Sequence, residues 1–564
     1  NVVSGGGANY VSIYNSSAAG EITKFQYQTI FQNFVASATG TFDFDKDLKL
    51  NIPLKSTTLV AYDFRKSDYT QYYTYGANVP TYTPYNASQA TTYKIQSDFK
   101  RPFVTYGYLV NQRFDYGELG GVSIGFRSDY SSAFGAGSKP FTFPRGDAYF
   151  RLSSLGFWDN SGLSKTILEF KLRAAYGKAG IQPQPFDRYV TLGTRAMGNG
   201  IGFYYPSAQS NPNLDVEVST ETEFGADIAL DLLNGSWLKR LNISATVWSR
   251  STDNAIWDVD TAPSTGVGTI KNNAFSLASD GFQFSLNMPV YTGSNIKWDL
   301  TTNFSKQFSK ITSLNGAAPV VVLSNAGSSN YVLRAGEAIG QLYGYKMLTS
   351  VNQLDTKGNP YIPVANQSQY EVASNGFVVN SASKQPIATT DLYSLGNSFP
   401  DFNMAFINDV SFKDWLSFSV QFDWVYNSHL YNQTKSWMYR DGISSDYEKP
   451  VTIAGESGAW TSFYRGVYAA GAFNGTKDYF YEDATFLRMR NISAAVDFAK
   501  LFQMKGFRRL QLVLSGRNLM TVTNYTGFDP EVSSGSTNSA FDRGVDHSTL
   551  PNYKSYQVTL NLGL

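Results

Sequence analysis

Carboxylates at short spacing are the first residues in this chain that could do chemistry. Asp43, Asp45 and Asp47 alternate in a short polar stretch, and alternating carboxylates are a feature of calcium-binding loops. They also lie between two segments with a strand-like pattern, where a solvated hairpin turn favours the same residue type. We expect a turn at this position, without a bound metal.

A general acid–base pair is the second chemical possibility. Glu223, Asp227 and Asp423 fall on the polar faces of expected strands. The wet interior of a β-barrel requires such inward polar residues without any catalysis. Histidine occurs only twice, as His429 and His547, and cysteine is absent, which excludes disulfides, thiolate metal sites and a cysteine nucleophile. We therefore expect no enzyme activity and no cofactor.

Aromatic residues in the long expected loops are better candidates for binding. Residues 203–205 read Phe-Tyr-Tyr, and residues 432–485 are rich in Tyr and Trp. Flat aromatic faces beside hydrogen-bonding groups suit sugar rings and extended peptides alike. The simpler alternative is that these aromatics pack the loops against each other or against a partner protein. The predicted substrate-binding residues are Tyr204, Tyr205, Trp437, Tyr439, Trp460 and Tyr464.

Composition limits the class of protein that carries these loops. Charged residues make up 16% of the 564 residues, and aromatic residues make up 15%. An average soluble protein has roughly 25% charged residues. No run approaches the roughly 20 apolar residues of a membrane-spanning helix, which excludes a helical membrane protein. Lys and Arg number 46 against 45 for Asp and Glu, so the charge gives no indication of nucleic-acid binding.

Apolar and polar residues alternate along much of the chain. In the last segment, Tyr556, Val558, Leu560, Leu562 and Leu564 alternate with Gln557, Thr559, Asn561 and Gly563. Successive side chains of a strand point to opposite faces, so one face of this segment is apolar. A membrane barrel has lipid on that face and water on the other, but a soluble sandwich gives the same pattern.

The lengths of the expected loops separate these two classes. We expect strands at 30–43, 49–64, 100–115, 119–132, 145–157, 166–179, 219–232, 241–258, 275–290, 296–312, 330–335, 339–349, 401–412, 416–431, 486–500, 510–523 and 552–564. Short connections, such as 43–48, 115–119, 233–240 and 412–416, alternate with long ones at 65–99, 180–218, 350–400, 432–485 and 524–551. Short periplasmic turns and long extracellular loops are typical of outer-membrane barrels. The predicted fold is therefore all-β, an antiparallel transmembrane β-barrel.

The expected strand count is odd. Seventeen strands are expected, whereas single-chain bacterial barrels have an even number, with both ends in the periplasm. Since the first and last expected strands run in the same direction, we expect the first strands of the barrel to precede residue 1. The segments at 330–335 and 339–349 are two expected strands, so the strand count stays odd whether or not both are included.

Several segments together resemble the SusC/RagA family of TonB-dependent outer-membrane transporters of Bacteroidetes. The C-terminal region carries Phe-Leu-Arg-Met-Arg-Asn-Ile at 486–492, Ser-Gly-Arg-Asn-Leu at 515–519 and Tyr-Thr-Gly-Phe-Asp-Pro-Glu-Val at 525–532. Further matches are Phe-Pro at 143–144, Lys-Leu-Arg-Ala-Ala-Tyr-Gly at 171–177, Tyr-Gly-Tyr-Lys at 343–346 and Gly-Asn-Ser-Phe-Pro-Asp-Phe at 396–402. The chain departs from the family at 127–132, where Arg-Asp-Gly-Ser-Ser is usual, and at Leu564, where Phe is usual.

The resemblance implies a 22-stranded transporter with a plugged lumen. Residues 1–564 would be its C-terminal barrel portion, and the plug domain and first strands would be absent from this chain. The family implies TonB-coupled uptake of oligosaccharides or oligopeptides at the cell outer membrane. It also implies a SusD-like surface lipoprotein as partner, contact with outer-membrane lipid, and TonB contact through a segment outside this chain. The alternatives left open are a passive porin and a structural barrel. A membrane-embedded enzyme is a third alternative, which the two isolated histidines disfavour.

Overall fold

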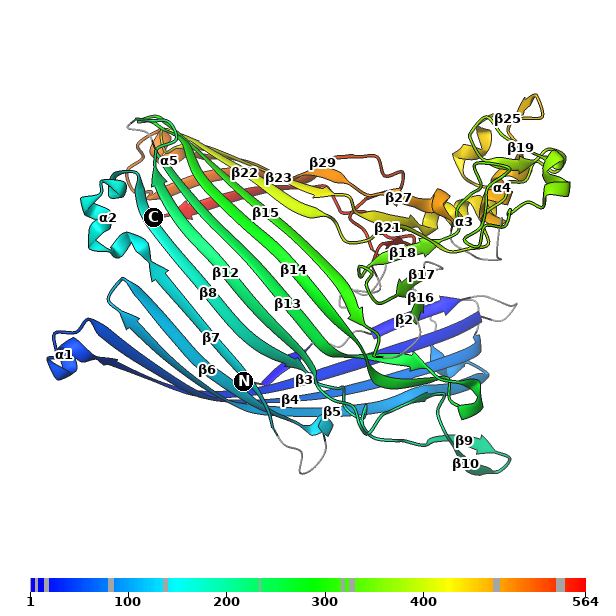
Figure 1. Ribbon diagram of the computed structural model, residues 1–564, viewed down its shortest axis with the longest axis horizontal. Helices are drawn as coiled ribbons and strands as arrows, with labels where there is room; N and C mark the ends of the chain where they lie inside the picture. Colours follow the sequence, from blue (N-terminus) through cyan, green and yellow to red (C-terminus); the bar gives the residue numbers. More distant parts are fainter. Residues whose placement is uncertain are drawn as a thin grey trace. The chain divides into compact units, whose positions relative to one another are not determined.

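The computed structural model describes residues 2–5, 9–14, 20–79, 86–134, 140–232, 235–315, 320–323, 330–469, 477–533 and 543–564. Antiparallel strands make up most of it (Figure 1). Among these residues, no helix is both long enough and apolar enough to cross a membrane. The chain divides into two compact units, and each is described separately.

Unit 1 comprises Asn1–Ser154, Arg173–Thr222 and Ser251–Phe275. Its sheet contains five strands in chain order, each antiparallel to the next: β3 (Gly20–Asp43), β4 (Leu54–Val79), β5 (Thr92–Tyr116), β6 (Gly120–Ser131) and β7 (Phe141–Arg151). Two short strands, β1 (Val2–Gly5) and β2 (Asn9–Tyr14), pair with β3. The unit also holds the hairpin of β9 (Gly193–Met197) and β10 (Gly200–Tyr204).

Unit 2 comprises Leu155–Leu172, Glu223–Arg250 and Ser276–Leu564. Its main sheet runs antiparallel in the order β14 (Thr269–Thr292), β15 (Ile296–Ser313), β22 (Phe402–Phe412), β23 (Leu416–Tyr426), β28 (Phe486–Asp497), β29 (Arg509–Thr523) and β31 (Ser555–Gly563). Strand β14 has residues in both units. The same is true of β8 (Ile167–Ile181), β12 (Glu217–Asp231) and β13 (Arg240–Asp260).

The predicted alternation of faces is confirmed in both sheets. In unit 1 the side chains of Val60, Ile124 and Phe126 are exposed on one face, while Asp63 and Arg127 form an ion pair on the other. In the last strand, β31, the apolar residues from Tyr556 to Leu562 are 61–78% exposed. Such exposure of large apolar side chains suits contact with lipid, so the polar face of each sheet is the lumen side of a barrel.

The short connections also agree with the prediction. Residues 43–54 hold the short helix α1 (Phe44–Leu48), whose N-cap is Asp43, and the side chain of Asp43 accepts from the backbone N–H groups of Asp45 and Lys46. These aspartates therefore shape a turn, and the described residues hold no cluster of acids and histidines suited to a metal. Part of the turn expected at 233–240 lies outside the described residues.

Two predicted barrel strands, 330–335 and 339–349, are wrong. The structure has only four-residue strands there, β17 (Asn330–Leu333) and β18 (Gln341–Gly344), which pair with each other. With β16 (Val320–Leu323) and β21 (Tyr393–Asn397) they form a small separate sheet. A barrel strand needs about nine to eleven residues to cross the hydrocarbon core, so four-residue strands cannot do so.

The long loop predicted at 65–99 is also corrected. Strand β4 continues to Val79 and β5 begins at Thr92, while β3 begins at Gly20 rather than near residue 30. No strand was predicted at β1 or β2. Strands of 24–26 residues exceed what the membrane requires, so their outer halves extend beyond the hydrocarbon core. Water on both faces removes the apolar–polar alternation there, which explains the error.

The long loops of unit 2 fold into a compact lobe, which we define as residues 345–389, 430–469, 477–484 and 544–547. It includes α3 (Gln433–Asp441) and α4 (Thr461–Ala469), visible together in Figure 1. The lobe has its own apolar core, in which Met347, Val379 and Ile453 meet aromatic residues of both helices. Because the lobe has an apolar core, its residues are held in a fixed arrangement and present an ordered surface.

Candidate functional site

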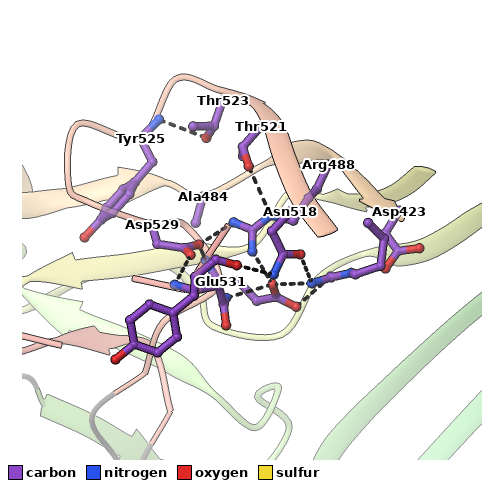
Figure 2. Close-up of polar contacts among 12 residues, drawn as sticks. Asp423, Ala484, Arg488, Asn518, Thr521, Thr523, Tyr525, Asp529 and Glu531 are labelled. Carbon is purple, nitrogen blue, oxygen red and sulfur yellow. Dashed lines mark hydrogen bonds and ion pairs between the residues drawn. The ribbon is translucent and has the colours of Figure 1, made fainter. Parts of the chain in front are cut away.

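An ion-pair network joins the strand end of β28 to residues 525–532. Arg488 donates to Asp529 and, at 2.6 Å, to Oε2 of Glu531. Arg490, two residues further on the same face, donates to Glu531 at 2.9 Å and to Asp423 of the neighbouring strand at 2.7 Å. Figure 2 shows the Arg488 side chain pointing toward both acidic residues of the loop. Together these contacts hold residues 525–532 against the polar face of unit 2.

Burial makes this network structurally important. The side chains of Arg488 and Asp529 are only 2% and 4% exposed. Burial alone would raise the pKa of Asp529, but donation from Arg488 and from the backbone N–H groups of Glu531 and Asn552 lowers it below its ordinary value. The carboxylate therefore stays charged beside the guanidinium. Removing one partner of such a pair leaves an uncompensated buried charge, which is strongly destabilising.

Residues 526–533 form part of the walls of two cavities. One, of about 310 Å³, we call the strand cavity; its lining includes Trp248, Gln307, Asn403, Phe486, Glu531 and Arg543. The other, of about 430 Å³, we call the lobe cavity; its lining includes Lys435, Met438, Asp446, Tyr479, Phe528 and Asp546. Both mix aromatic faces with hydrogen-bonding groups, as small-ligand sites do.

Two of the predicted binding residues, Tyr439 and Tyr464, lie inside the lobe core. They are 0% and 3% exposed, and their rings are 6.0 Å apart. The Tyr439 hydroxyl donates to Asp446 at 2.7 Å and lies 2.7 Å from the hydroxyl of Tyr479, while Tyr464 donates to the carbonyl of Lys449. Burial, with these bonds to Asp446 and Tyr479, raises the pKa of Tyr439 far above its ordinary value. In this structure both residues pack the loops against each other, which is the simpler of the two alternatives.

The two predicted tryptophans, Trp437 and Trp460, are partly buried in the same lobe. Trp460 packs against the core and donates from its indole N–H to the carbonyl of Val451 at 2.8 Å. Trp437 packs edge-on against His547, with ring centroids 4.6 Å apart, and carries the Arg440 guanidinium over its ring. Ligand contact by Trp437 and Trp460 therefore stays a prediction.

The remaining predicted pair, Tyr204 and Tyr205, lies at the end of the β9–β10 hairpin of unit 1. They are 42% and 67% exposed, and Arg195 lies over the ring of Tyr204. Phe203 beside them is 72% exposed. Their exposure makes them available for contact with a ligand or a partner, and their role stays a prediction.

Two of the carboxylates considered for acid–base chemistry, Asp227 and Asp423, are held by donors. Asp227 accepts from Ser244 at 2.8 Å and lies 3.6 Å from the Lys171 ammonium, and Asp423 is bound by Arg490. His429 packs tightly against Gly396, whose φ of +140° and closeness to the imidazole leave no room for a side chain. These contacts account for Asp227 and Asp423 as structural groups.

The ion-pair network of Arg488, Arg490, Asp529 and Glu531 was not predicted, although these residues lie in motifs that carried the family resemblance. A usable signal was present: two arginines two residues apart share one strand face, and two acidic residues two apart follow in a loop. The pairing itself joins residues 41 positions apart, which spacing along the chain does not reveal.

Comparisons with known proteins agree with the resemblance. The chain is 26% identical over 452 residues to TonB-dependent receptor P3 of Formosa agariphila, covering 77% of this chain and 43% of that protein. It is 22% identical to TonB-dependent receptor SusC of Bacteroides thetaiotaomicron, covering 86% of this chain and 45% of SusC. No family model matches the chain. The chain thus spans less than half the length of these relatives.

The fold likeness extends over nearly the whole chain. The RagAB peptide transporter superposes with a TM-score of 0.70 at 18% identity, covering 98% of this chain and 57% of that one. The RagAB peptide importer in an open state gives 0.71 at 17% identity. These findings confirm the resemblance to SusC/RagA-type TonB-dependent receptors, the antiparallel β-barrel fold and the outer-membrane location.

Proposed function

We propose that this chain is the C-terminal barrel portion of an active nutrient importer of the SusC type. The observation that supports this most strongly is the combination of a lipid-facing sheet with a folded loop lobe, in a chain similar to TonB-dependent receptors over most of its length. The plug domain and first strands would be supplied by a part outside residues 1–564. Uptake would be driven by TonB, and the chain's role is binding and gating without a bond-breaking step.

The proposed substrates are oligosaccharides or oligopeptides. The strand cavity and the lobe cavity offer aromatic faces beside amide, hydroxyl and charged groups, which suit either polymer. The ordered lobe and the exposed Tyr204 and Tyr205 offer surfaces on which a SusD-like lipoprotein could close. Residues 526–528 line the lobe cavity and residues 530–533 line the strand cavity, so the Arg488 network, which holds this loop, would fix the geometry of both.

Two measurements on protein purified from its native outer membrane test this proposal. Mass spectrometry of the intact complex is expected to find a plug-containing polypeptide and a surface lipoprotein. In planar bilayers the complex is expected to show no steady conductance, because a plug fills the lumen. A constant open conductance without a plug-containing polypeptide would instead establish a passive porin.

A further inference from the structure

The outer halves of β3, β4 and β5 carry a continuous row of aromatic rings. Five residues follow one another across these three strands in the order Tyr73, Phe25, Tyr27, Tyr69 and Phe99, and we call them the aromatic path. Successive ring centroids are 6.1, 5.8, 6.3 and 6.2 Å apart. The rings therefore form one connected apolar track rather than isolated pairs.

The aromatic path lies on the same face of the sheet as the lumen charges. Along β3, Phe25 and Tyr27 share a face with Val35, and no bulge interrupts the register between them. Val35 stands opposite Asp63, which forms ion pairs with Arg65 at 2.7 Å and Arg127 at 3.0 Å. A molecule moving along the path would thus reach the polar face that lines the lumen.

The path lies outside the hydrocarbon core. The short turn at α1 marks the opposite end of β3 and β4, and about nine to eleven residues from that turn suffice to cross the membrane. The path therefore belongs to the long-loop, extracellular end. Phe31, on the same face and 51% exposed, lies between the path and the lumen charges.

The groups beside the path favour a sugar chain over a peptide. The backbone of β4 is paired on both sides along the path, with β3 and with β5, so no main-chain edge is available to an extended peptide there. What remains are ring faces and polar side chains. Tyr69 donates to Gln71 at 2.7 Å, Gln71 donates to Ser97 at 3.3 Å, and Arg101 lies over the Tyr69 ring. Aromatic faces with such polar edges match the apolar face and hydroxyl edges of a saccharide ring.

We propose that the aromatic path is a binding track for a linear oligosaccharide on its way to the lumen. This inference rests on the proposed importer function and selects glycans among its candidate substrates. The competing explanation is that the rings merely stabilise a long sheet, as cross-strand aromatic pairs do. If the path binds a sugar, removing its rings should weaken binding and removing rings on the opposite face should not. If the rings only stabilise the sheet, the two changes should affect binding equally.

The test compares two double variants of the complete complex. Tyr27→Leu with Tyr69→Leu removes the middle of the path. Tyr72→Leu with Tyr93→Leu removes the same number of tyrosines from the opposite face of the sheet, where their hydroxyls lie 3.2 Å apart. Calorimetric titration uses maltohexaose, cellohexaose, xylohexaose and laminarihexaose, with a mixed hexapeptide library as the peptide probe. Heat-modifiable electrophoretic mobility confirms that each variant is folded.

We expect at least one hexasaccharide to bind the unmodified complex and to bind the path variant about tenfold to a hundredfold more weakly, from two lost ring contacts. Binding to the opposite-face variant should change less than twofold. The inference is overturned if no hexasaccharide binds, if both variants weaken binding equally, or if only hexapeptides depend on the path. TonB-dependent uptake that persists in any of these cases leaves the importer function standing, so the two failures are distinguishable.

Discussion

At the scale of single residues, several charged side chains are buried away from water. Arg488 and Asp529 form a buried ion pair, and Lys477 is a buried cation in the lobe that donates to the carbonyl of Tyr468. Buried charges of these two kinds behave oppositely on substitution. Removing one member of an ion pair leaves the other member uncompensated, whereas a buried cation without a carboxylate partner costs stability while it is charged.

Replacing Arg488 by Gln is expected to loosen the loop at 525–532. The change leaves Asp529 buried without its cation, which costs about 3–5 kcal/mol in comparable buried pairs. Hydrogen exchange of the backbone amides in 525–532 should therefore become much faster. Arg440→Gln is the control, because Arg440 forms its ion pair with its exposed neighbour Asp441, and it should leave exchange in 525–532 unchanged. Equal protection in the Arg488 variant would contradict a holding role.

Replacing Lys477 by Met is expected to remove a pH dependence of lobe stability. Burial lowers the pKa of Lys477 to about 8, and among the described residues no carboxylate forms an ion pair with it. Its pKa in the unfolded chain is about 10.4. Between these values the unfolded state binds more protons, so stability should rise as the pH increases from about 8 to 10. Urea unfolding at several pH values should show this rise in the unmodified protein and a smaller one in Lys477→Met.

At the scale of elements, the bilayer explains which parts of the fold could be predicted. Strands β22 and β29 were predicted to within one residue at each end, because lipid on one face and water on the other impose strict alternation. Strand β23 begins at Leu416 as predicted but ends at Tyr426 rather than at residue 431. The extensions of β3, β4 and β5 have water on both faces, so their Tyr-rich sequence resembles a loop. The short strands β17 and β18 have four residues each, so their length excludes them from the barrel.

A matched pair of substitutions in β31 tests the assignment of faces. Val558 is 70% exposed on the apolar face, whereas its neighbour Thr559 faces the other way. Lysine on the lipid face near the midplane costs about 2–4 kcal/mol, and a lumen position tolerates it. Guanidinium unfolding should therefore show a large loss for Val558→Lys and a small one for Thr559→Lys. The reverse order would contradict the lipid-facing assignment.

The lobe and the hairpin should respond differently to loss of a tyrosine. Tyr439 is fully buried, so Tyr439→Ala should destabilise the lobe by about 3–5 kcal/mol, as large core truncations do. Tyr205 is exposed, and Tyr205→Ala should change stability by less than about 0.5 kcal/mol while weakening capture of a ligand or partner. Thermal unfolding combined with binding measurements separates these outcomes. Unchanged binding in Tyr205→Ala would remove that residue from the predicted site.

At the scale of the whole molecule, the sequence predicts the fold class and the location, whereas packing between distant segments is seen only in the structure. The alternation of faces and the loop lengths predicted the barrel, and the family resemblance predicted the outer-membrane location and the type of relative found. It did not predict that Tyr439 and Tyr464 form a lobe core, because that depends on packing between segments far apart in the sequence. The aromatic path escaped prediction for a related reason, since its rings come from three strands whose outer halves were taken for loops.

The central claim is active import across the outer membrane, and TonB-dependent uptake tests it most directly. The measurement is accumulation of fluorescently labelled oligosaccharides and oligopeptides in cells that carry the gene for this chain, lack it, or lack TonB. We predict accumulation of at least one labelled substrate that is lost both without this gene and without TonB. Accumulation that requires the gene but continues unchanged without TonB would contradict active import and support a passive pore.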